Sequence, residues 1–365
     1  MEFNFEVFIY QLPLWGFIVL SSFTAFLVTY VSIPAIADAS KHLNVFEPKS
    51  SRGSHHGDVP TLGGVAIFIG IVISGTLFLP INIIEDYRYL FAALLILFVF
   101  GVRDDLLVLK PKNKFYIELL VALIATILGD IRITSFQGFL GVEEIPYLAS
   151  VPFSVFVYIL IINGFNLIDG IDGLASGIAI LVSLAFGALF LLNDDKSYAY
   201  APFMLAGSLA AFFRFNVFSK KNKIFLGDTG SLTIGFLIAT ITITLLEQSS
   251  SGGVVHQLIS VPALTIAILI VPLFDTLRVF ILRILSGESP FQADRKHIHH
   301  RLLSMGYSHQ KSTLLIMCSN LLIIGISLLF GALIGALNLL IVFIVAAGLS
   351  YIPIHIVDRR SIKMK

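Results

Sequence analysis

Long apolar runs constrain this chain more than any other feature of its sequence. Eleven runs occur, separated by short polar segments, at about residues 14–36, 62–81, 87–101, 115–129, 150–168, 174–192, 199–214, 231–246, 259–281, 313–331 and 334–356. A helix needs about 20 mostly apolar residues to cross a bilayer, and some runs are short, so ten or twelve crossings also fit. Only 13% of the residues are charged, roughly half the share of a soluble domain. The sequence therefore predicts an all-α polytopic membrane protein with about eleven transmembrane helices, formed by residues 1–365 as one domain.

The positions of the basic residues indicate the orientation. Twenty-one of the 24 Lys and Arg residues fall in one set of alternate loops, and the other three are Arg88, Arg132 and Lys196. Short loops rich in Lys and Arg stay in the cytoplasm. We therefore expect the N-terminus outside, the C-terminus in the cytoplasm, and the loop after the run 150–168 on the cytoplasmic side.

Four polar residues recur at every third position where the run 150–168 ends, namely Asn163, Asn166, Asp169 and Asp172. On a helix, this spacing would place two amides and two carboxylates along one face. Ligand oxygens of this kind suit Mg²⁺. The alternative interpretation is a broken helix end that these short side chains cap.

Two acids and a lysine follow the run 87–101. Asp104 and Asp105 are adjacent, and Lys114 precedes the next run. Adjacent carboxylates repel and desolvation disfavours their charge, so one of them can have a raised pKa. That suits a proton acceptor or a metal-facing acid, while Lys114 suits a phosphate. The alternative is a pair of solvated loop acids balanced by lysines.

The segment before the run 231–246 combines a basic cluster at 220–223 with Phe225 and Asp228. Asp228 is well placed to cap the next helix, and it is equally well placed to share a metal with Asn166. Phe225 can stack on a base.

Three histidines and an arginine end the loop 290–301, as His297, His299, His300 and Arg301. Histidines can bind a transition metal, but the interleaved Arg and Lys would repel a cation. Binding of a phosphate or of sugar hydroxyls fits better, and a solvated basic loop is the alternative. In the preceding run, Asp275 and Arg278 are expected to form a structural pair.

Acids suited to Mg²⁺ and cations suited to phosphates are thus expected at one membrane face. This combination indicates phosphoryl chemistry on a nucleotide-type substrate, with a lipid as the second substrate. A membrane transporter is the alternative from another class. Transporters tend to place ionisable residues near the bilayer midplane, whereas the middles of these runs are almost free of charge.

Four motifs occur together and in order: Asp104-Asp105, Asn163-x-x-Asn166-x-x-Asp169-Gly-x-Asp172-Gly-Leu, Gly227-Asp-Thr-Gly-Ser231 and His297-x-His-His-Arg301. In these motifs the chain resembles the polyprenyl-phosphate N-acetylhexosamine-1-phosphate transferases, the WecA- and TagO-like members of glycosyltransferase family 4. The resemblance implies transfer of N-acetylhexosamine-1-phosphate, with GlcNAc-1-phosphate favoured, from the UDP-sugar to undecaprenyl phosphate. UMP is released, and the reaction is the first membrane step of a cell-envelope polysaccharide pathway. MraY-like phospho-muramoyl-pentapeptide transfer is the alternative, but that branch would show three consecutive histidines where Ile298 interrupts them here.

The resemblance also implies roles for individual residues. Asn166 and Asp228 would hold Mg²⁺, for which Mn²⁺ can substitute. The implied catalytic residues are Asp104, Asp105, Asp228 and His300, with Asp104 or Asp105 acting on the lipid phosphate. The implied substrate-binding residues are Lys114, Asn163, Asp169, Gly170, Ile171, Asp172, Phe225, His297, His299 and Arg301. In this set Lys114 would meet a phosphate, while Phe225 and Asp172 would contact uracil.

The implied setting is the bacterial inner (plasma) membrane, where the lipid bilayer surrounds a multi-pass protein with a cytoplasmic active site. A homodimer is compatible with the sequence, and no nucleic acid is expected as a partner. The lipid phosphate is expected to attack the β-phosphorus of the UDP-sugar directly. A route through a phosphorylated aspartate is the alternative.

Overall fold

The computed structural model describes residues 14–43, 59–79, 84, 87–107, 109–136, 138, 141–193, 195–249, 260–287, 297–331 and 335–363. Its main helices are α2 (Leu14–His42), α3 (Gly63–Phe78), α5 (Arg88–Leu107), α6 (Pro111–Leu123), α7 (Tyr147–Ile168), α8 (Leu174–Leu192), α9 (Tyr200–Phe218), α10 (Gly227–Ser249), α12 (Val261–Ile268), α13 (Ile270–Leu285), α14 (Ile298–Ser304), α15 (His309–Leu329) and α16 (Gly335–Lys363). A π-helical turn, η1 (Ile124–Leu128), continues α6, and a 3₁₀ turn, η3 (Lys196–Ala199), precedes α9. The described residues form no β-strand, so the predicted all-α class is confirmed.

Each of the predicted apolar runs lies on a helix or on a pair of consecutive helices. Among the described helices, 6 are long and apolar enough to cross a membrane, or 7 if one bent pair counts as a single span. Two further apolar segments are shorter, namely α3 (Gly63–Phe78) and the stretch Gly335–Tyr351 of α16. A multi-pass membrane protein follows from these lengths and compositions, while the number of eleven crossings stays a prediction.

The run 259–281, expected as one span, is divided into α12 and α13, which meet at 75°. Pro272 explains the break, because proline has no N–H to donate to the carbonyl of Ile268. α15 supplies other donors: Asn320 Nδ2 lies 3.2 Å from that carbonyl oxygen and 3.4 Å from the carbonyl oxygen of Ala267. An unbonded carbonyl is costly inside a membrane, so Asn320 stabilises the bend.

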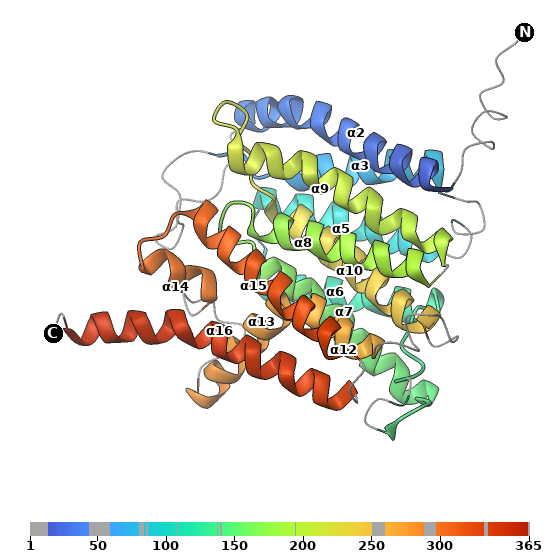
Figure 1. The fold of residues 1–365 in the computed structure, drawn as a ribbon. Coiled ribbons are helices and arrows are strands. Elements are labelled where there is room, and N and C mark those ends of the chain that lie inside the picture. Colours follow the sequence, from blue (N-terminus) through green and yellow to red (C-terminus); the bar gives the residue numbers. More distant parts are fainter. Residues whose placement is uncertain are drawn as a thin grey trace, which may run out of the picture.

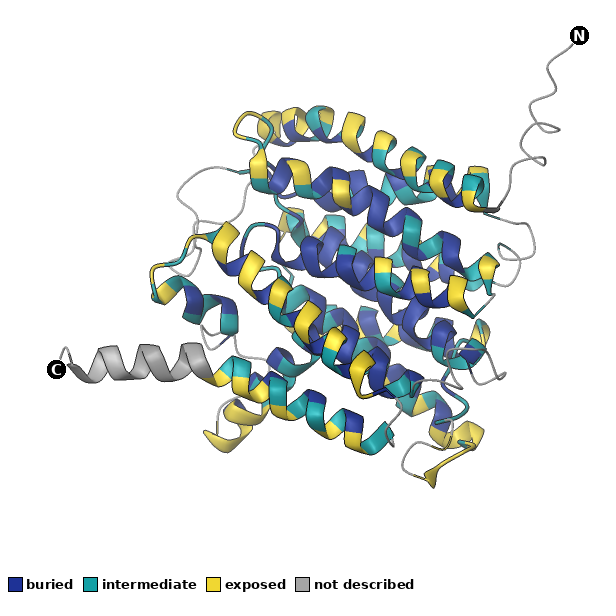
Figure 2. Cartoon of the chain, in the orientation of Figure 1, coloured by how far each residue is buried: buried dark blue, intermediate teal, exposed yellow. Residues whose placement is uncertain are grey.

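α10 lies at the centre of the helix bundle, packed against α7, α5, α3 and α8. It is buried along most of its length, whereas α2, α15 and α16 expose one side (Figure 2). A Cβ on Gly64 of α3 would overlap the backbone of Gly230, and a Cβ on Gly101 of α5 would overlap that of Thr229. Small residues permit such close helix packing in membranes. The start of α10 is therefore clamped between α3 and α5.

The start of α2 and the end of α16 lie at opposite ends of the bundle (Figure 1). This arrangement fits an odd number of crossings. The orientation inferred from the basic loops stays a prediction.

Candidate active site

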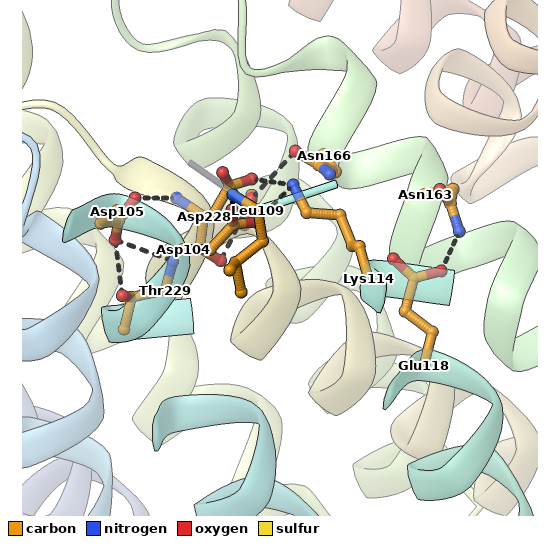
Figure 3. Close-up of polar contacts among 10 residues, drawn as sticks. Asp104, Asp105, Leu109, Lys114, Glu118, Asn163, Asn166, Asp228 and Thr229 are labelled. Carbon is orange, nitrogen blue, oxygen red and sulfur yellow. Dashed lines mark hydrogen bonds and ion pairs between the residues drawn. The ribbon is translucent and has the colours of Figure 1, made fainter. Parts of the chain in front are cut away.

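Four helix ends meet at one end of the bundle and bring together polar residues that are far apart in the sequence (Figure 3). They contribute Asp104 and Asp105 from the end of α5, Lys114 from the first turn of α6, Asn166 from the end of α7 and Asp228 from the first turn of α10. The acid pair, the lysine and Asp228, expected only at one membrane face, therefore lie together.

Lys114 lies between two carboxylates. Its Nζ is 2.6 Å from Oδ1 of Asp228 and 3.0 Å from Oδ2 of Asp104. The other oxygen of Asp104 accepts a hydrogen bond from the N–H of Leu109 at 2.7 Å. Burial would lower the pKa of Lys114, but the charges of Asp228 and Asp104 outweigh burial and raise it. Lys114 is therefore a fixed positive charge in an acidic cluster.

Asp105 binds different partners from its neighbour Asp104, because successive helical residues point about 100° apart. It accepts hydrogen bonds from the backbone N–H groups of Asp228 at 2.7 Å and Thr229 at 3.1 Å, and from the Thr229 hydroxyl at 2.6 Å. Burial raises the pKa of Asp105 to about 7, although the hydrogen bonds from Thr229 act in the opposite direction. Asp105 thus caps α10 from another helix and fixes the position of Asp228. Its implied action on the lipid phosphate stays a prediction.

The expectation of a single polar helix face was wrong for Asp169 and Asp172. α7 ends at Ile168, and both acids lie in the turn that follows. Glycine disfavours helix, and this turn contains Gly170 and Gly173. Gly173 has a φ of +78°, a conformation that glycine adopts without a steric penalty. The helix breaks here, as the alternative interpretation expected, while capping by these side chains stays a prediction.

Asn163 and Asn166 remain on α7 but face different helices. Asn166 faces α10, where its Oδ1 lies 3.3 Å from Oγ of Ser231. Asn163 faces α6 and donates a hydrogen bond of 2.5 Å to Oε2 of Glu118. Sequence reasoning missed Glu118. The signal that would have found it was an acid within the apolar run 115–129, because ionisable residues inside membrane spans are rare and often functional.

A second charged cluster forms around Asp172. Lys223 Nζ lies 2.7 Å from Oδ2 of Asp172, and His309 Nδ1 lies 3.6 Å from the same oxygen. Lys223 also lies over the ring of Phe225, 5.6 Å from its centroid. The turn after α7, the loop before α10 and the start of α15 therefore meet at Asp172. Nothing in the sequence distinguished His309 from the other histidines in loops.

The histidine segment packs against the turn after α7. His297 and His299 are buried, with ring centroids 5.9 Å apart, and the ring of His300 lies 4.2 Å from that of His299. A Cβ on Gly170 would overlap the His299 ring, so glycine is required for this contact. Burial, reinforced by the charge of His300, lowers the pKa of His299 to about 3. His299 is therefore a neutral ring that joins α14 to this turn.

The remaining predicted site residues lie in the same two elements. In the turn after α7, Asp169 and Gly170 are partly exposed and Ile171 is buried. In α14, His300 and Arg301 are partly exposed. Within the described part of the chain, no three His, Cys, Asp or Glu side chains lie close enough to hold a metal ion by themselves.

The structural pair of Asp275 and Arg278 is confirmed, with Arg278 Nη2 2.8 Å from Oδ1 of Asp275. Asp275 has further partners that the sequence did not indicate. Its Oδ2 lies 2.8 Å from Nδ1 of His297, and its Oδ1 accepts the N–H of Ile298 at 3.1 Å. Asp275 therefore ties α13 to the start of α14.

Replacing Asp275 by asparagine is expected to lower stability more than turnover. Removal of one partner from a buried ion pair costs about 3–5 kcal/mol, and Arg278 and His297 would both lose their carboxylate. We expect a clearly lower melting temperature in detergent, with most of the specific activity kept in the protein that remains folded. Asp38→Asn, on the exposed side of α2, is the matched control. An unchanged melting temperature with lost activity would contradict the structural role.

Comparison with known proteins decides the family. The family model of glycosyl transferase family 4 matches residues 87–246. A probable undecaprenyl-phosphate N-acetylglucosaminyl 1-phosphate transferase of Bacillus subtilis is 33% identical over 301 residues, which are 82% of this chain and 81% of that protein. The chain belongs to glycosyl transferase family 4. The predicted resemblance is therefore confirmed.

Other relatives of this family 4 glycosyl transferase have a lower sequence identity, but their alignments cover a similar share of the chain. The undecaprenyl-phosphate alpha-N-acetylglucosaminyl 1-phosphate transferase of Escherichia coli K12 is 28% identical over 315 residues, covering 83% of this chain and 81% of the relative. The decaprenyl-phosphate N-acetylglucosaminephosphotransferase of Mycobacterium tuberculosis H37Rv is 28% identical over 316 residues, covering 80% and 77%. The match to the family model spans α5 to α10 and so contains the Lys114 cluster, whereas the histidine segment lies beyond it.

Proposed function

We propose that this chain transfers GlcNAc-1-phosphate from UDP-GlcNAc to undecaprenyl phosphate, forming the lipid-linked diphospho-sugar and UMP. The names of the relatives support the transferred group and the polyprenyl acceptor. The observation that carries the proposal is the cluster in which Lys114 lies between Asp104 and Asp228. It lies at one end of an apolar bundle, where a soluble nucleotide and the phosphate of a membrane lipid can meet.

The proposed setting is the bacterial inner membrane, with about eleven crossings, the N-terminus outside and the site at the cytoplasmic face. The concentration of Lys and Arg in one set of alternate loops supports this orientation. The lipid acceptor and the UDP-sugar then reach the site from the bilayer and the cytoplasm respectively. A homodimer stays a prediction of the sequence alone.

The proposal includes Mg²⁺, or Mn²⁺ in its place, near Asp228 and Asn166. Oxygen donors of this kind suit hard cations, and Mg²⁺ is commonly held by one or two carboxylates together with substrate phosphates. Oδ2 of Asp104 is buried and, apart from its ion pair with Lys114, has no hydrogen-bond partner among the described residues. These donors fit such an ion, which when bound would neutralise charge on the diphosphate.

The proposed reaction is a direct displacement at phosphorus. An oxygen of the lipid phosphate forms a bond to the β-phosphorus of UDP-GlcNAc, and the bond from that phosphorus to the bridging oxygen breaks, so that UMP leaves with this oxygen. A phosphate monoester with a second pKa of about 6 is already largely ionised at pH 7, so the reaction needs no strong base. Lys114 stabilises the charge that builds up on the phosphates, and Asp104 orients the acceptor.

The nucleotide and the sugar are proposed to lie on the other side of the site. Phe225 stacks on uracil, and Asp172, with Gly170 and Ile171, contacts its edge. His300 and Arg301 face the diphosphate or the sugar. The ion pair of Asp172 with Lys223, which also lies over the Phe225 ring, supports one site built from these elements.

Purified protein in detergent, given UDP-GlcNAc, undecaprenyl phosphate and Mg²⁺, is expected to release one UMP for each lipid-linked sugar formed. Detergent removes the sealed compartment that a transporter would need, so UMP release separates the two classes. Omission of the lipid is the control. Release of UMP only from UDP-muramoyl-pentapeptide would favour the MraY-like alternative, and release from no UDP-sugar would contradict the proposal. Exchange of labelled UMP into UDP-GlcNAc without lipid would favour the phospho-aspartate route over direct attack.

A further inference from the structure

Glu118 is a buried acid for which the proposed reaction has no role. It is 1% exposed and lies one helical turn after Lys114 in α6. Oε2 accepts the hydrogen bond from Asn163 at 2.5 Å. Oε1 is buried and has no hydrogen-bond partner among the described residues. A buried acceptor without a donor is destabilising, so an unfilled carboxylate oxygen at this position requires an explanation.

Lys114 is a candidate donor. Residues four apart on a helix lie on the same face, with Cβ atoms about 5–6 Å apart. The charge of Glu118 interacts with those of Lys114 and Asp228. In Figure 3 the Lys114 side chain points away from Glu118, toward Asp228 and Asp104. The ammonium group of Lys114 therefore contacts Asp104 and Asp228, while Glu118, on the same face of α6, is a second possible acceptor.

A divalent cation would balance the charges of this region. Asp104, Asp228 and Glu118 are acidic, and Lys114 is the base between them. Asp105 is satisfied separately by the start of α10. A divalent cation beside Asp104 and Asp228 would form one neutral group, and Lys114 with Glu118 would form another. Buried charges are tolerated when they are paired, and this arrangement pairs all of them.

We propose that Glu118 is the second docking position of the Lys114 ammonium, which moves from Asp228 to Oε1 of Glu118 when a divalent cation binds. The cation and the ammonium compete for the same Asp228 oxygen, since Lys114 Nζ lies 2.6 Å from it. By accepting Lys114, Glu118 removes that competition. It is a positioning residue that acts through Lys114, and the inference rests on the cation of the proposed function.

Mn²⁺ binding to the purified protein without substrates, followed by electron paramagnetic resonance, tests the inference by a double-mutant cycle. In Glu118→Gln, Lys114 loses its second position and keeps competing, so the Mn²⁺ dissociation constant is expected to rise on the order of tenfold. In Lys114→Met the competitor is absent, and adding Glu118→Gln is expected to change the constant less than about twofold. The amide oxygen introduced by Glu118→Gln can still accept the hydrogen bond from Asn163, and the melting temperature checks folding.

The possible results separate the two ideas. If Glu118→Gln weakens Mn²⁺ binding equally with and without Lys114, the carboxylate acts only through its charge and the docking role is overturned. Glu118→Asp is the second variant, since it keeps the charge but shortens the side chain. Weakened binding supports docking, and unchanged binding overturns it. If the wild-type protein releases UMP but binds no Mn²⁺, the cation of the proposed function is wrong. The docking role of Glu118 is then wrong as well, while the proposed transfer reaction is still supported.

Discussion

Asp228→Asn is expected to reduce UMP release at least about a hundredfold, the loss typical of one preorganised charge in an active site. Asp228 is the carboxylate closest to Lys114, with 2.6 Å between Oδ1 and Nζ. It lies in the first turn of α10, where the backbone is fixed by Asp105 and by the packing of Gly64 against Gly230. Asparagine keeps the shape of the side chain and removes its charge, so the fold is expected to survive.

The measurement is the initial rate of UMP release over a range of Mg²⁺ concentrations, together with the melting temperature. Asp38→Asn is the matched control, because it removes one exposed acid at a place far from the cluster in sequence. Activity near that of the wild type in Asp228→Asn would show that the metal assignment is wrong. A large fall in the melting temperature would instead show that Asp228 stabilises α10 through its charge.

Asp105→Asn is expected to lower the free energy of unfolding by about 2–4 kcal/mol and to lower activity with it. The carboxylate of Asp105 accepts three hydrogen bonds from Asp228 and Thr229. The amide NH₂ of asparagine would face a donor on at least one side, so at least one N–H at the start of α10 would lose its partner. Asp228 would then be displaced from Lys114.

The neighbouring substitution Asp104→Asn provides the matched control. Asp104 contacts Lys114 and the N–H of Leu109 rather than the start of α10. We expect Asp104→Asn to lose activity with a smaller loss of stability than Asp105→Asn in a denaturant titration in detergent, because Lys114 keeps its ion pair with Asp228. Equal stability of the two variants, with activity lost in both, would contradict the capping role and favour the implied action of Asp105 on the lipid phosphate.

The two predictions distinguish the residues of this cluster that take part in the reaction from those that hold other residues in position. Asp104, Asp228 and Lys114 face one another, whereas Asp105 and Glu118 each hold another part of the site in place. If this division is correct, losses at Asp228 appear in turnover and its Mg²⁺ dependence. Losses at Asp105 appear first in stability, and losses at Glu118 appear first in cation affinity.

The class of fold and the family could be inferred from the amino-acid sequence. Burial in a bilayer depends on the apolar content of about 20 consecutive residues, which is a local property, so the runs lie on helices in the structure. The motifs that pointed to the family are also local, and so is the alternation of loops that predicted acids and lysines at one membrane face. The three-residue spacing of polar residues wrongly predicted a continuous helix across residues 168–173. The end of α7 depends instead on two glycines, and on the His299 ring that packs against one of them.

The partner of each charged side chain, in contrast, depends on how the helices pack. Asp104 and Asp105 are indistinguishable as neighbouring acids, and the phase of α5 directs one to Lys114 and the other to the start of α10. The pair Lys114–Asp228 joins helices that are distant in the sequence, and the pair Glu118–Asn163 joins α6 to α7. Such pairs depend on how helices pack and rotate against one another, and that packing is set by long-range contacts such as Gly64 against Gly230. No spacing along the chain encodes those contacts, because helix packing is decided by the summed fit of many side chains.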